Sequence, residues 1–342
     1  MLNLFKVPFV IIILFYLNAK AQNFTSEILS EKIINGPEGI SCISTYDCSE
    51  IYVSSYRDGN IYQIDLKNKK THLKINMNKS LHNLGWITGY SILGITTDID
   101  GNIFITAPNF KGGSVCFYHK NKNLISCPIN NLGLINGLFY DHDKSELYLT
   151  DQKDGRILKI LNKEIKKWQS GSFETNNESK FQVIAQDLDL PNGITKVKDS
   201  LYFLEGSILA SSEKYLSQFN LLNNQLTKLS TIDTQPDGII YDEKRNSLII
   251  TEHEMGLIQE WKLNDKFPLL RTLANLNFGR NYKIAPANII KIKDNTYAFT
   301  DLWDYDFYDV AKAAYQNLEN DHTEKHKMVT YHTKVYQIVI EE

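Results

Sequence analysis

Four side chains that could bind a metal ion recur at one position of a repeated motif, directly before a glycine and an apolar residue. The six repeats place at this position Glu38, Leu93, Asn136, Asn192, Asp237 and Ala287, and the last repeat has asparagine instead of the glycine. The two carboxylates and two amides offer oxygen ligands, which suit calcium, because calcium takes about six to eight oxygens and lets water complete its shell. No cysteine or histidine occupies the position, which argues against zinc. The leucine and the alanine cannot bind a cation.

The spacing of the motif predicts the fold that brings these side chains together. Successive motif positions lie 55, 43, 56, 45 and 50 residues apart, from 93−38, 136−93, 192−136, 237−192 and 287−237. A period of roughly 40 to 50 residues with strand-like content is typical of a propeller. Within each repeat, apolar runs are separated by turns rich in Asp, Asn and Gly, which indicates antiparallel strands. We predict an all-β fold, a six-bladed β-propeller that forms one domain over residues 22–342.

The two ends of the chain should close the ring of blades. Residues 24–35 and 334–340 are isolated strand-like pieces. A ring leaves no exposed edge when its last blade takes a strand from the other terminus. We expect the N-terminal piece to be the outer strand of blade six. The first strand of each blade then lines the central channel and starts at the motif, so that the six motif residues meet around one mouth.

This convergence decides between two explanations of the motif. Asn-Gly and Asp-Gly are common turn dipeptides, and each motif taken singly is better explained as a turn. Four oxygen-bearing residues at the one position that converges on the axis need a common cause. Carboxylates crowded near an axis also repel one another unless a cation lies between them. The sequence therefore predicts metal ligands at Glu38, Asn136, Asn192 and Asp237.

The loops between the second and third strands return to the same mouth and offer further site residues. The candidates for contact with a substrate are Tyr56, Asn109, Phe110, Asp151, Glu205 and Trp303. His253, at the corresponding point of blade five, could act as an acid or base near neutral pH. An exposed loop histidine is an equally good explanation of it. His322, His326 and His332 fit a solvated loop better than a metal cluster.

A long insert in blade six has no place in a plain blade. Residues 304–332 follow a strand that ends near Asp301, and residues 308–318 have helical spacing. The expected helix places Val310, Ala311, Ala314 and Tyr315 on one face. We expect this helical insert to fold over the mouth as a lid, because long insertions beside sites often control access. The alternative is a solvated surface loop.

Composition and the N-terminus predict a secreted protein that acts on small molecules. The formal net charge of −3 over 342 residues gives no reason to expect a nucleic-acid partner. Residues 1–21 combine Lys6, an apolar run and the sequence Ala19-Lys20-Ala21, which is the pattern of a cleaved signal peptide. An uncleaved anchor is the alternative, although the apolar run is short for a membrane span. We expect an extracellular or periplasmic monomer with no membrane attachment after cleavage.

The cysteines agree with such a compartment. Each of two pairs is symmetric about a hairpin tip, so we predict the disulfides Cys42–Cys48 and Cys116–Cys127. Four free buried thiols are the alternative. Glycosylation sequons begin at Asn23, Asn78 and Asn177, but a chain rich in asparagine also produces such sequons by chance.

On these motifs the chain resembles the family of senescence-marker proteins, gluconolactonases and luciferin-regenerating enzymes. It resembles paraoxonase, squid diisopropylfluorophosphatase and strictosidine-synthase-like proteins more distantly. The family resemblance implies a six-bladed propeller with a divalent cation at the top of its channel. The family's ligands are a Glu in blade one, an Asn in each of blades three and four and an Asp in blade five. Glu38, Asn136, Asn192 and Asp237 match these in type and order, most closely in Asn192-Gly193 and Pro236-Asp237-Gly238.

The resemblance implies a secreted calcium-dependent hydrolase of lactones or esters, with another divalent cation as a possible substitute. The cation would polarise the carbonyl, and Asp237 would act as base or nucleophile. Sugar lactonases of this family carry an arginine just before the blade-three asparagine, where this chain has Gly133-Leu134-Ile135, so a less polar substrate fits better. A non-catalytic propeller of the yellow and royal-jelly type, which binds a small amine or aromatic ligand, is the alternative. A lyase or synthase of the strictosidine-synthase type ranks third, and no Gly-x-Ser-x-Gly motif supports a serine hydrolase.

Overall fold

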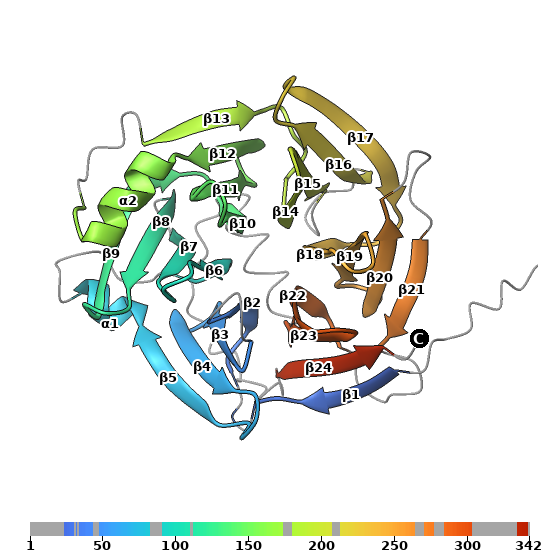
Figure 1. The fold of residues 1–342 in the computed structure, drawn as a ribbon, viewed down its shortest axis with the longest axis horizontal. Helices are drawn as coiled ribbons and strands as arrows, with labels where there is room; N and C mark the ends of the chain where they lie inside the picture. Colours follow the sequence, from blue (N-terminus) through green and yellow to red (C-terminus); the bar gives the residue numbers. More distant parts are fainter. Residues whose placement is uncertain are drawn as a thin grey trace, which may run out of the picture.

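The computed structural model describes residues 24–30, 32, 34–43, 48–82, 91–109, 112–173, 180–206, 213–263, 270–276, 284–302 and 334–340. These residues form six four-stranded antiparallel sheets arranged around a central axis, so the predicted six-bladed β-propeller is confirmed (Figure 1). The signal peptide predicted for residues 1–21 and the helical insert predicted at 304–332 lie outside the described residues.

Each of the first three blades takes its strands in chain order from the axis outward. Blade one contains β2 (Pro37–Cys42), β3 (Glu50–Ser55), β4 (Asn60–Asp65) and β5 (Thr71–Asn76). Blade two contains β6 (Ile95–Thr97), β7 (Ile103–Asn109), β8 (Gly112–His119) and β9 (Leu124–Leu132). Blade three contains β10 (Ile135–Asp141), β11 (Glu146–Asp151), β12 (Arg156–Ile160) and β13 (Phe181–Ala185).

The remaining blades follow the same order until the last, which joins both ends of the chain. Blade four contains β14 (Ile194–Val197), β15 (Ser200–Glu205), β16 (Lys214–Asn220) and β17 (Gln225–Ile232). Blade five contains β18 (Pro236–Asp242), β19 (Ser247–Glu252), β20 (Leu257–Lys262) and β21 (Leu270–Asn275). Blade six contains β22 (Pro286–Lys293), β23 (Thr296–Asp301), β24 (Val335–Ile340) and β1 (Phe24–Ile28). The N-terminal strand is therefore the outer strand of blade six, as predicted.

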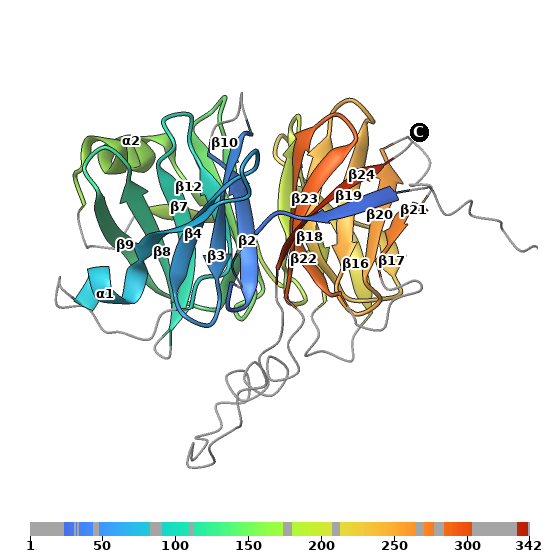
Figure 2. The same cartoon turned by 90° about the horizontal axis from the view of Figure 1, so that it is seen from below.

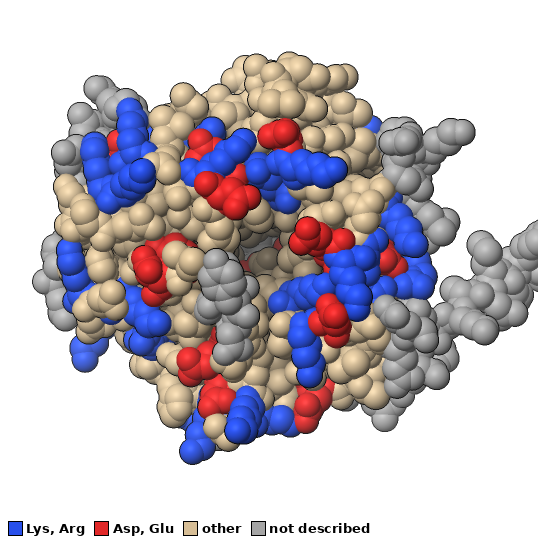
Figure 3. Space-filling view, in the orientation of Figure 1, with Lys and Arg blue, Asp and Glu red and all other residues tan. Residues whose placement is uncertain are grey.

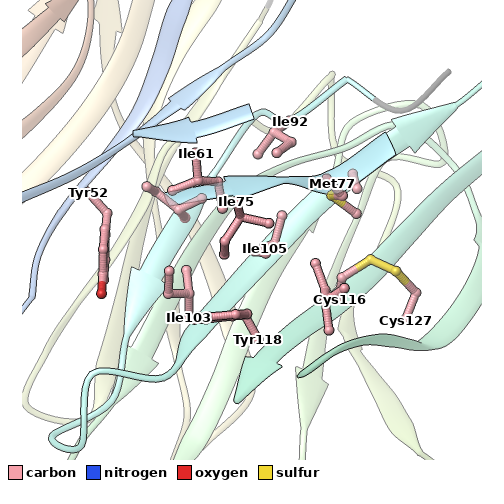
Figure 4. Packing of buried hydrophobic residues seen from close by; sticks show 13 residues of the cluster. Tyr52, Ile61, Ile75, Met77, Ile92, Ile103, Ile105, Cys116, Tyr118 and Cys127 are labelled. Carbon is pink, nitrogen blue, oxygen red and sulfur yellow. A yellow bond between two sulfur atoms is a disulfide. The ribbon is translucent and has the colours of Figure 1, made fainter. Parts of the chain in front are cut away.

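The core is divided into one apolar cluster at each contact between neighbouring blades. Successive residues of a strand point to opposite faces of its sheet, so each face meets a different neighbour. In β3, Tyr52 packs against blade two, whereas Ile51 and Val53 pack against blade six. Figure 4 shows the cluster between blades one and two, which includes the disulfide between Cys116 and Cys127. Burial of large aliphatic and aromatic side chains at every contact holds the ring together.

Both predicted disulfides are present. Cys116 in β8 is bonded to Cys127 in β9, and both are fully buried. Cys42, the last residue of β2, is bonded to Cys48, just before β3. Each bond closes a short hairpin, and no free cysteine remains, so the alternative of four free thiols is wrong.

Two helices lie outside the blades in the described part of the chain. α1 (Met77–His82) follows the outer strand of blade one, and α2 (Asn162–Ser170) connects the two outer strands of blade three. α2 ends at Gly171, whose φ of 87° forms a left-handed cap that only glycine adopts easily. Each first strand starts at the motif and runs away from it, the second strand returns, and the third runs away again. α2 follows the third strand of blade three, so it lies at the end of the molecule opposite the motif, near the turns between first and second strands (Figure 2).

Ion pairs join neighbouring blades at that opposite end. Lys196 of blade four lies 2.8 Å from Asp141 of blade three, and Lys291 of blade six lies 2.7 Å from Asp242 of blade five. Figure 3 views the molecule from the side of α2 and shows both signs of charge interspersed around a central hollow. Among the described residues of this face, positive side chains therefore alternate with negative ones.

A repeated hydroxyl bridge joins the blades at the motif end. A serine or threonine near the end of the second strand accepts a hydrogen bond from the motif N–H of its own blade and donates one to the motif carbonyl of the next blade. In blade three, Gly137 N donates to Thr150 Oγ1 at 2.9 Å, and Thr150 Oγ1 donates to Asn192 O at 2.7 Å. The hydroxyls that do this are Ser54, Thr106, Thr150, Thr251 and Thr300. Blade four has Leu204 there, and Gly193 N donates directly to Asp237 O at 3.1 Å.

We predict that Thr251→Val destabilises the ring, because it leaves the buried Gly238 N–H and Ala287 carbonyl without the hydroxyl that joins them. Each stranded group should cost about 1–3 kcal/mol of unfolding free energy. Thr251→Ser keeps the hydroxyl and is the matched control. Urea denaturation with the disulfides intact measures the difference, and equal midpoints for the valine variant and the parent protein would contradict the bridge.

Candidate metal centre

The six motif residues form a ring around the axis because each motif carbonyl lies against the motif of the preceding blade. A Cβ atom added to Gly137 would lie 2.4 Å from Asn192 O, and one added to Gly193 would lie 2.2 Å from Asp237 O. Such distances exclude any side chain, so glycine is required here by the close approach of two backbones. Thr300 Oγ1 donates to Glu38 O at 2.6 Å and thereby closes the ring between blades six and one.

The four predicted ligands are all buried at this ring. Glu38 is 2 % exposed, and Asn136, Asn192 and Asp237 are each 9 % exposed. Asn192 Nδ2 donates a hydrogen bond to Asp237 Oδ1 at 2.9 Å, which orients the amide so that its oxygen is not committed to this contact. Leu93 and Ala287 complete the ring as apolar members, with 4 % and 0 % exposure.

The electrostatics of the ring show that its two carboxylates lie close together. Burial raises the pKa of Glu38 well above its ordinary value, and the negative charge of Asp237 raises it further. Burial also raises the pKa of Asp237 to about 6, against the hydrogen bond from Asn192, which lowers it. Two buried carboxylates that repel each other need either a shared proton or a cation.

Two ring oxygens have no hydrogen-bond partner among the described residues. These are Oε2 of Glu38 and Oδ1 of Asn136, both fully buried. Buried polar atoms are nearly always paired, so each exception needs an explanation. A hard cation bound by the two carboxylates and the two amide oxygens would satisfy both atoms, and the oxygen-only donor set fits calcium.

Among the described residues, no group of three His, Cys, Asp or Glu side chains could hold a metal. The ring contributes only two carboxylates to such a group, and its other two donors are amides. The donor set therefore fits a hard cation such as calcium and not zinc.

His253 lies beside the ring, so the explanation as an exposed loop histidine is wrong. It is 6 % exposed, and its Nδ1 is 3.9 Å from Asp237 Oδ2. Its backbone N–H donates to Gln235 O at 2.9 Å, which ties it to the loop before β18. A catalytic role for His253 stays a prediction.

Three of the predicted substrate contacts have described side chains. Tyr56 follows β3, is half-buried, and its N–H donates to Gly36 O at 2.7 Å. Asp151 and Glu205 are 0 % and 1 % exposed, and their oxygens accept hydrogen bonds from protein groups, including the backbone N–H groups of Gly133 and Asp189. Contact of any of the three with a substrate stays a prediction.

Most of the other predicted positions have no described side chain. Asn109 ends β7, but its side chain lies outside the described residues, as do Phe110, Trp303, Asn23 and Asn177. Asn78 lies in α1, and its Nδ2 donates to Asp58 O at 3.4 Å. A glycan on Asn78 would have to replace this contact.

Two features of the site were not singled out from the sequence. Gln152 is 6 % exposed and occupies in blade three the place that His253 occupies in blade five, since Ile135 pairs with Asp151 as Pro236 pairs with Glu252. The second feature is the set of serine and threonine hydroxyls that bridge neighbouring blades. An alignment of the six second strands shows serine or threonine at five equivalent places and would have found them.

The sequence matches no protein-family model and no curated protein. Its structure is similar to a gluconolactonase from Xanthomonas campestris, with a TM-score of 0.62 and 11% identity over 95% of this chain and 92% of that one. The calcium-binding protein regucalcin from Agrobacterium tumefaciens gives a TM-score of 0.59 and 11% identity over 93% and 94%. A PQQ-bound aldose sugar dehydrogenase from Streptomyces coelicolor gives 0.61 and 11% identity over 94% and 99%. At such identity the likeness shows the propeller fold, which these proteins use for different chemistries.

Two findings bear on the cellular location. Both disulfides are formed, and such bonds persist in oxidising compartments. Among the described residues, neither helix has the length and apolar character needed to cross a membrane.

We predict that chelator-treated protein loses stability as the pH rises. The pKa of Asp237 is raised from 3.8 to about 6, so the folded chain binds this proton more tightly than the unfolded chain does. The stabilisation is complete below about pH 4 and is lost as the pH rises through about 6. Calcium should replace the proton, so its addition should raise Tm little near pH 5 and strongly near pH 8. Scanning calorimetry with EDTA or calcium measures this, and an equal calcium effect at both pH values would argue against the site.

Proposed function

We propose that the protein is a calcium-dependent hydrolase of lactones or esters, with its metal at the ring of Glu38, Asn136, Asn192 and Asp237. The observation that carries the proposal is the pair of buried, unpartnered oxygens on Glu38 and Asn136, next to a second carboxylate. An apolar ring would form the same fold without desolvating two carboxylates, so their presence indicates a ligand. Another divalent cation with oxygen preference could substitute for calcium.

The ring residues would have different roles in such a reaction. The four oxygen donors would hold the cation, and the bound cation would act as a Lewis acid toward a substrate carbonyl. Asn192 orients Asp237 through the 2.9 Å hydrogen bond. Asp237, ionised once the cation has replaced its proton, would accept a proton from water or attack the carbonyl directly. His253, whose Nδ1 is 3.9 Å from Asp237 Oδ2, would receive or return that proton after a small approach.

The substrate should be less polar than a sugar lactone. Gly133, Leu134 and Ile135 precede Asn136, and none of them can bind sugar hydroxyls as an arginine would. The similarity to a gluconolactonase and to a calcium-binding regucalcin supports the hydrolase class and the metal, while the substrate class rests on this chain's own residues.

The same missing arginine favours a second candidate function, a propeller that binds a small amine or aromatic ligand without turnover. In that case the metal ring would serve binding or stability. We further propose export by the segment 1–21, a monomeric state and no nucleic-acid or membrane partner for the mature chain, consistent with the two disulfides.

We predict that Asp237→Asn abolishes turnover and leaves the fold intact. The amide keeps an oxygen ligand but loses the charge and the basicity that proton transfer requires. Loss of a base of this kind should lower kcat by about 100-fold or more. The hydrolysis rates of the variant and the parent protein, compared at saturating calcium, measure the effect. Parental rates in the variant would exclude a catalytic role for Asp237.

A panel of lactones and aryl esters, each tested with EDTA and with calcium, separates the two candidate functions. A hydrolase should turn over at least one apolar lactone or ester and lose that activity in EDTA. A protein that binds calcium but hydrolyses no member of the panel would support the binding function. Turnover that survives complete removal of divalent cations would argue against the metal ring as the active site.

A further inference from the structure

A polar side chain at the end of the second strand ties down the loop that leads into the first strand of the same blade. We call these residues loop braces. In blade one, Ser55 Oγ donates to Asn35 O at 2.5 Å. In blades three, four and six a carboxylate accepts a backbone N–H: Asp151 Oδ2 from Gly133 at 3.2 Å, Glu205 Oε2 from Asp189 at 2.9 Å, and Asp301 Oδ1 from Ala285 at 2.9 Å. In blade five, Glu252 Oε2 accepts from the Thr234 hydroxyl. All five are at most 3 % exposed.

The point at which each brace holds its loop follows the distribution of metal ligands. In the four blades with an oxygen-bearing motif residue, the held residue lies three positions before it, from 38−35, 136−133, 192−189 and 237−234. In blade six, whose motif residue is Ala287, the distance is two, from 287−285. Blade two, whose motif residue is Leu93, has Ala107 at the brace position and therefore no side-chain brace.

We propose that Ser55, Asp151, Glu205 and Glu252 are positioning residues that aim the four metal ligands at the cation. This inference rests on the metal ring of the proposed function and assigns the braces a task that requires no contact with substrate. Each brace holds the residue three positions before a ligand, through a backbone atom in blades one, three and four and through the Thr234 hydroxyl in blade five, so it sets the direction in which that ligand enters the ring. Groups of this kind, which orient metal ligands without touching the metal, tune affinity strongly.

The fold itself does not require the braces. Blade two forms its four strands with an alanine at this position. Burying a carboxylate is costly unless it is well paired, so a propeller that needed only rigid blades would gain by avoiding it. Carboxylates nevertheless occupy the position in three of the four ligand-bearing blades and in blade six, but the residue that they hold lies three positions before the motif residue only in the ligand-bearing blades.

Blade four shows what the brace restrains. The loop before Asn192 contains two non-glycine residues in the left-handed region, Asp187 with φ 60° and Leu190 with φ 48°. Leu190 directly precedes Pro191, where left-handed backbone is especially unfavourable. Glu205 accepts the Asp189 N–H between these two residues, and Gly206 N donates to Asp189 O at 2.7 Å. Without Glu205 this strained loop would relax, and Asn192 would lose its direction.

Calcium titration of metal-free protein by calorimetry tests the proposal, with calcium alone as the probe. Glu205→Ala should weaken calcium binding by about 10–100-fold, as the loss of other orienting partners does. Glu205→Gln loses the charge but keeps an oxygen that can accept the Asp189 N–H, so its Kd should rise by no more than about threefold. Asp301→Ala is the matched control, because it removes an equally short N–H contact from a blade without a ligand. Its Kd should stay within about threefold of the parent's while its Tm in EDTA falls, since a buried N–H is left unpaired.

Each outcome decides the question. Equal weakening by Glu205→Ala and Asp301→Ala would show that the braces act only on stability, and equal weakening by Glu205→Ala and Glu205→Gln would show an effect of charge alone. If Glu205→Ala does not fold, Thr234→Val removes the corresponding contact in blade five, with Thr234→Ser as its control, and should weaken calcium binding by about tenfold. A parent protein that binds no calcium would refute the metal ring itself, whereas tight binding unaffected by the brace variants would refute only the positioning role.

Discussion

The hydroxyl bridge between adjacent blades is the interaction on which the architecture of the site depends. Each bridging hydroxyl is at once an acceptor for its own blade and a donor to the next, so the backbone of one motif is held against the backbone of its neighbour. At the five motif glycines this contact leaves no room for a Cβ atom, whereas blade six makes the same bridge with Asn288. In the proposed site the residue before the glycine answers a separate demand, that of the cation which four of the six would bind.

Where the bridge is missing, the ring keeps its geometry by another route. Leu204 replaces the hydroxyl in blade four, and the N–H of Gly193 reaches the carbonyl of Asp237 without an intermediary. This blade also contributes Asn192, which hydrogen-bonds to Asp237 in blade five. Blades four and five are therefore joined by a direct backbone contact and by a side-chain contact at the same point.

The repeat spacing is sufficient to predict the propeller, and the need to avoid free sheet edges predicts its closure by the N-terminal strand. The symmetry of each cysteine pair about a hairpin tip predicts both disulfides. The convergence of Glu38 and Asp237 also followed from topology alone. The hydrogen bonds of Asp151 and Glu205 to backbone N–H groups could not be predicted. A carboxylate at a strand end has the same sequence pattern whether it faces solvent, a ligand or a backbone N–H. His253 was equally ambiguous until its burial and its distance from Asp237 were known. Such distinctions depend on the packing of residues far apart in sequence, and pattern does not contain that information.

The closure of blade six has a consequence for how the chain matures. β1 pairs with β24, so Phe24 lies opposite Ile340 across a separation of 316 residues, from 340−24. β1 leaves the ribosome before the other described strands and has no partner until β24 has been made. Blades one to five can form as the chain emerges, since each is built from neighbouring segments, but blade six cannot. Blade six can therefore be completed only after β24 has been made, and the packing of Leu29 and Val335 between blades six and one forms no earlier. Until then the chain can form at most blades one to five and the hairpin of β22 and β23, so the outer half of blade six is the last part of the ring to be completed.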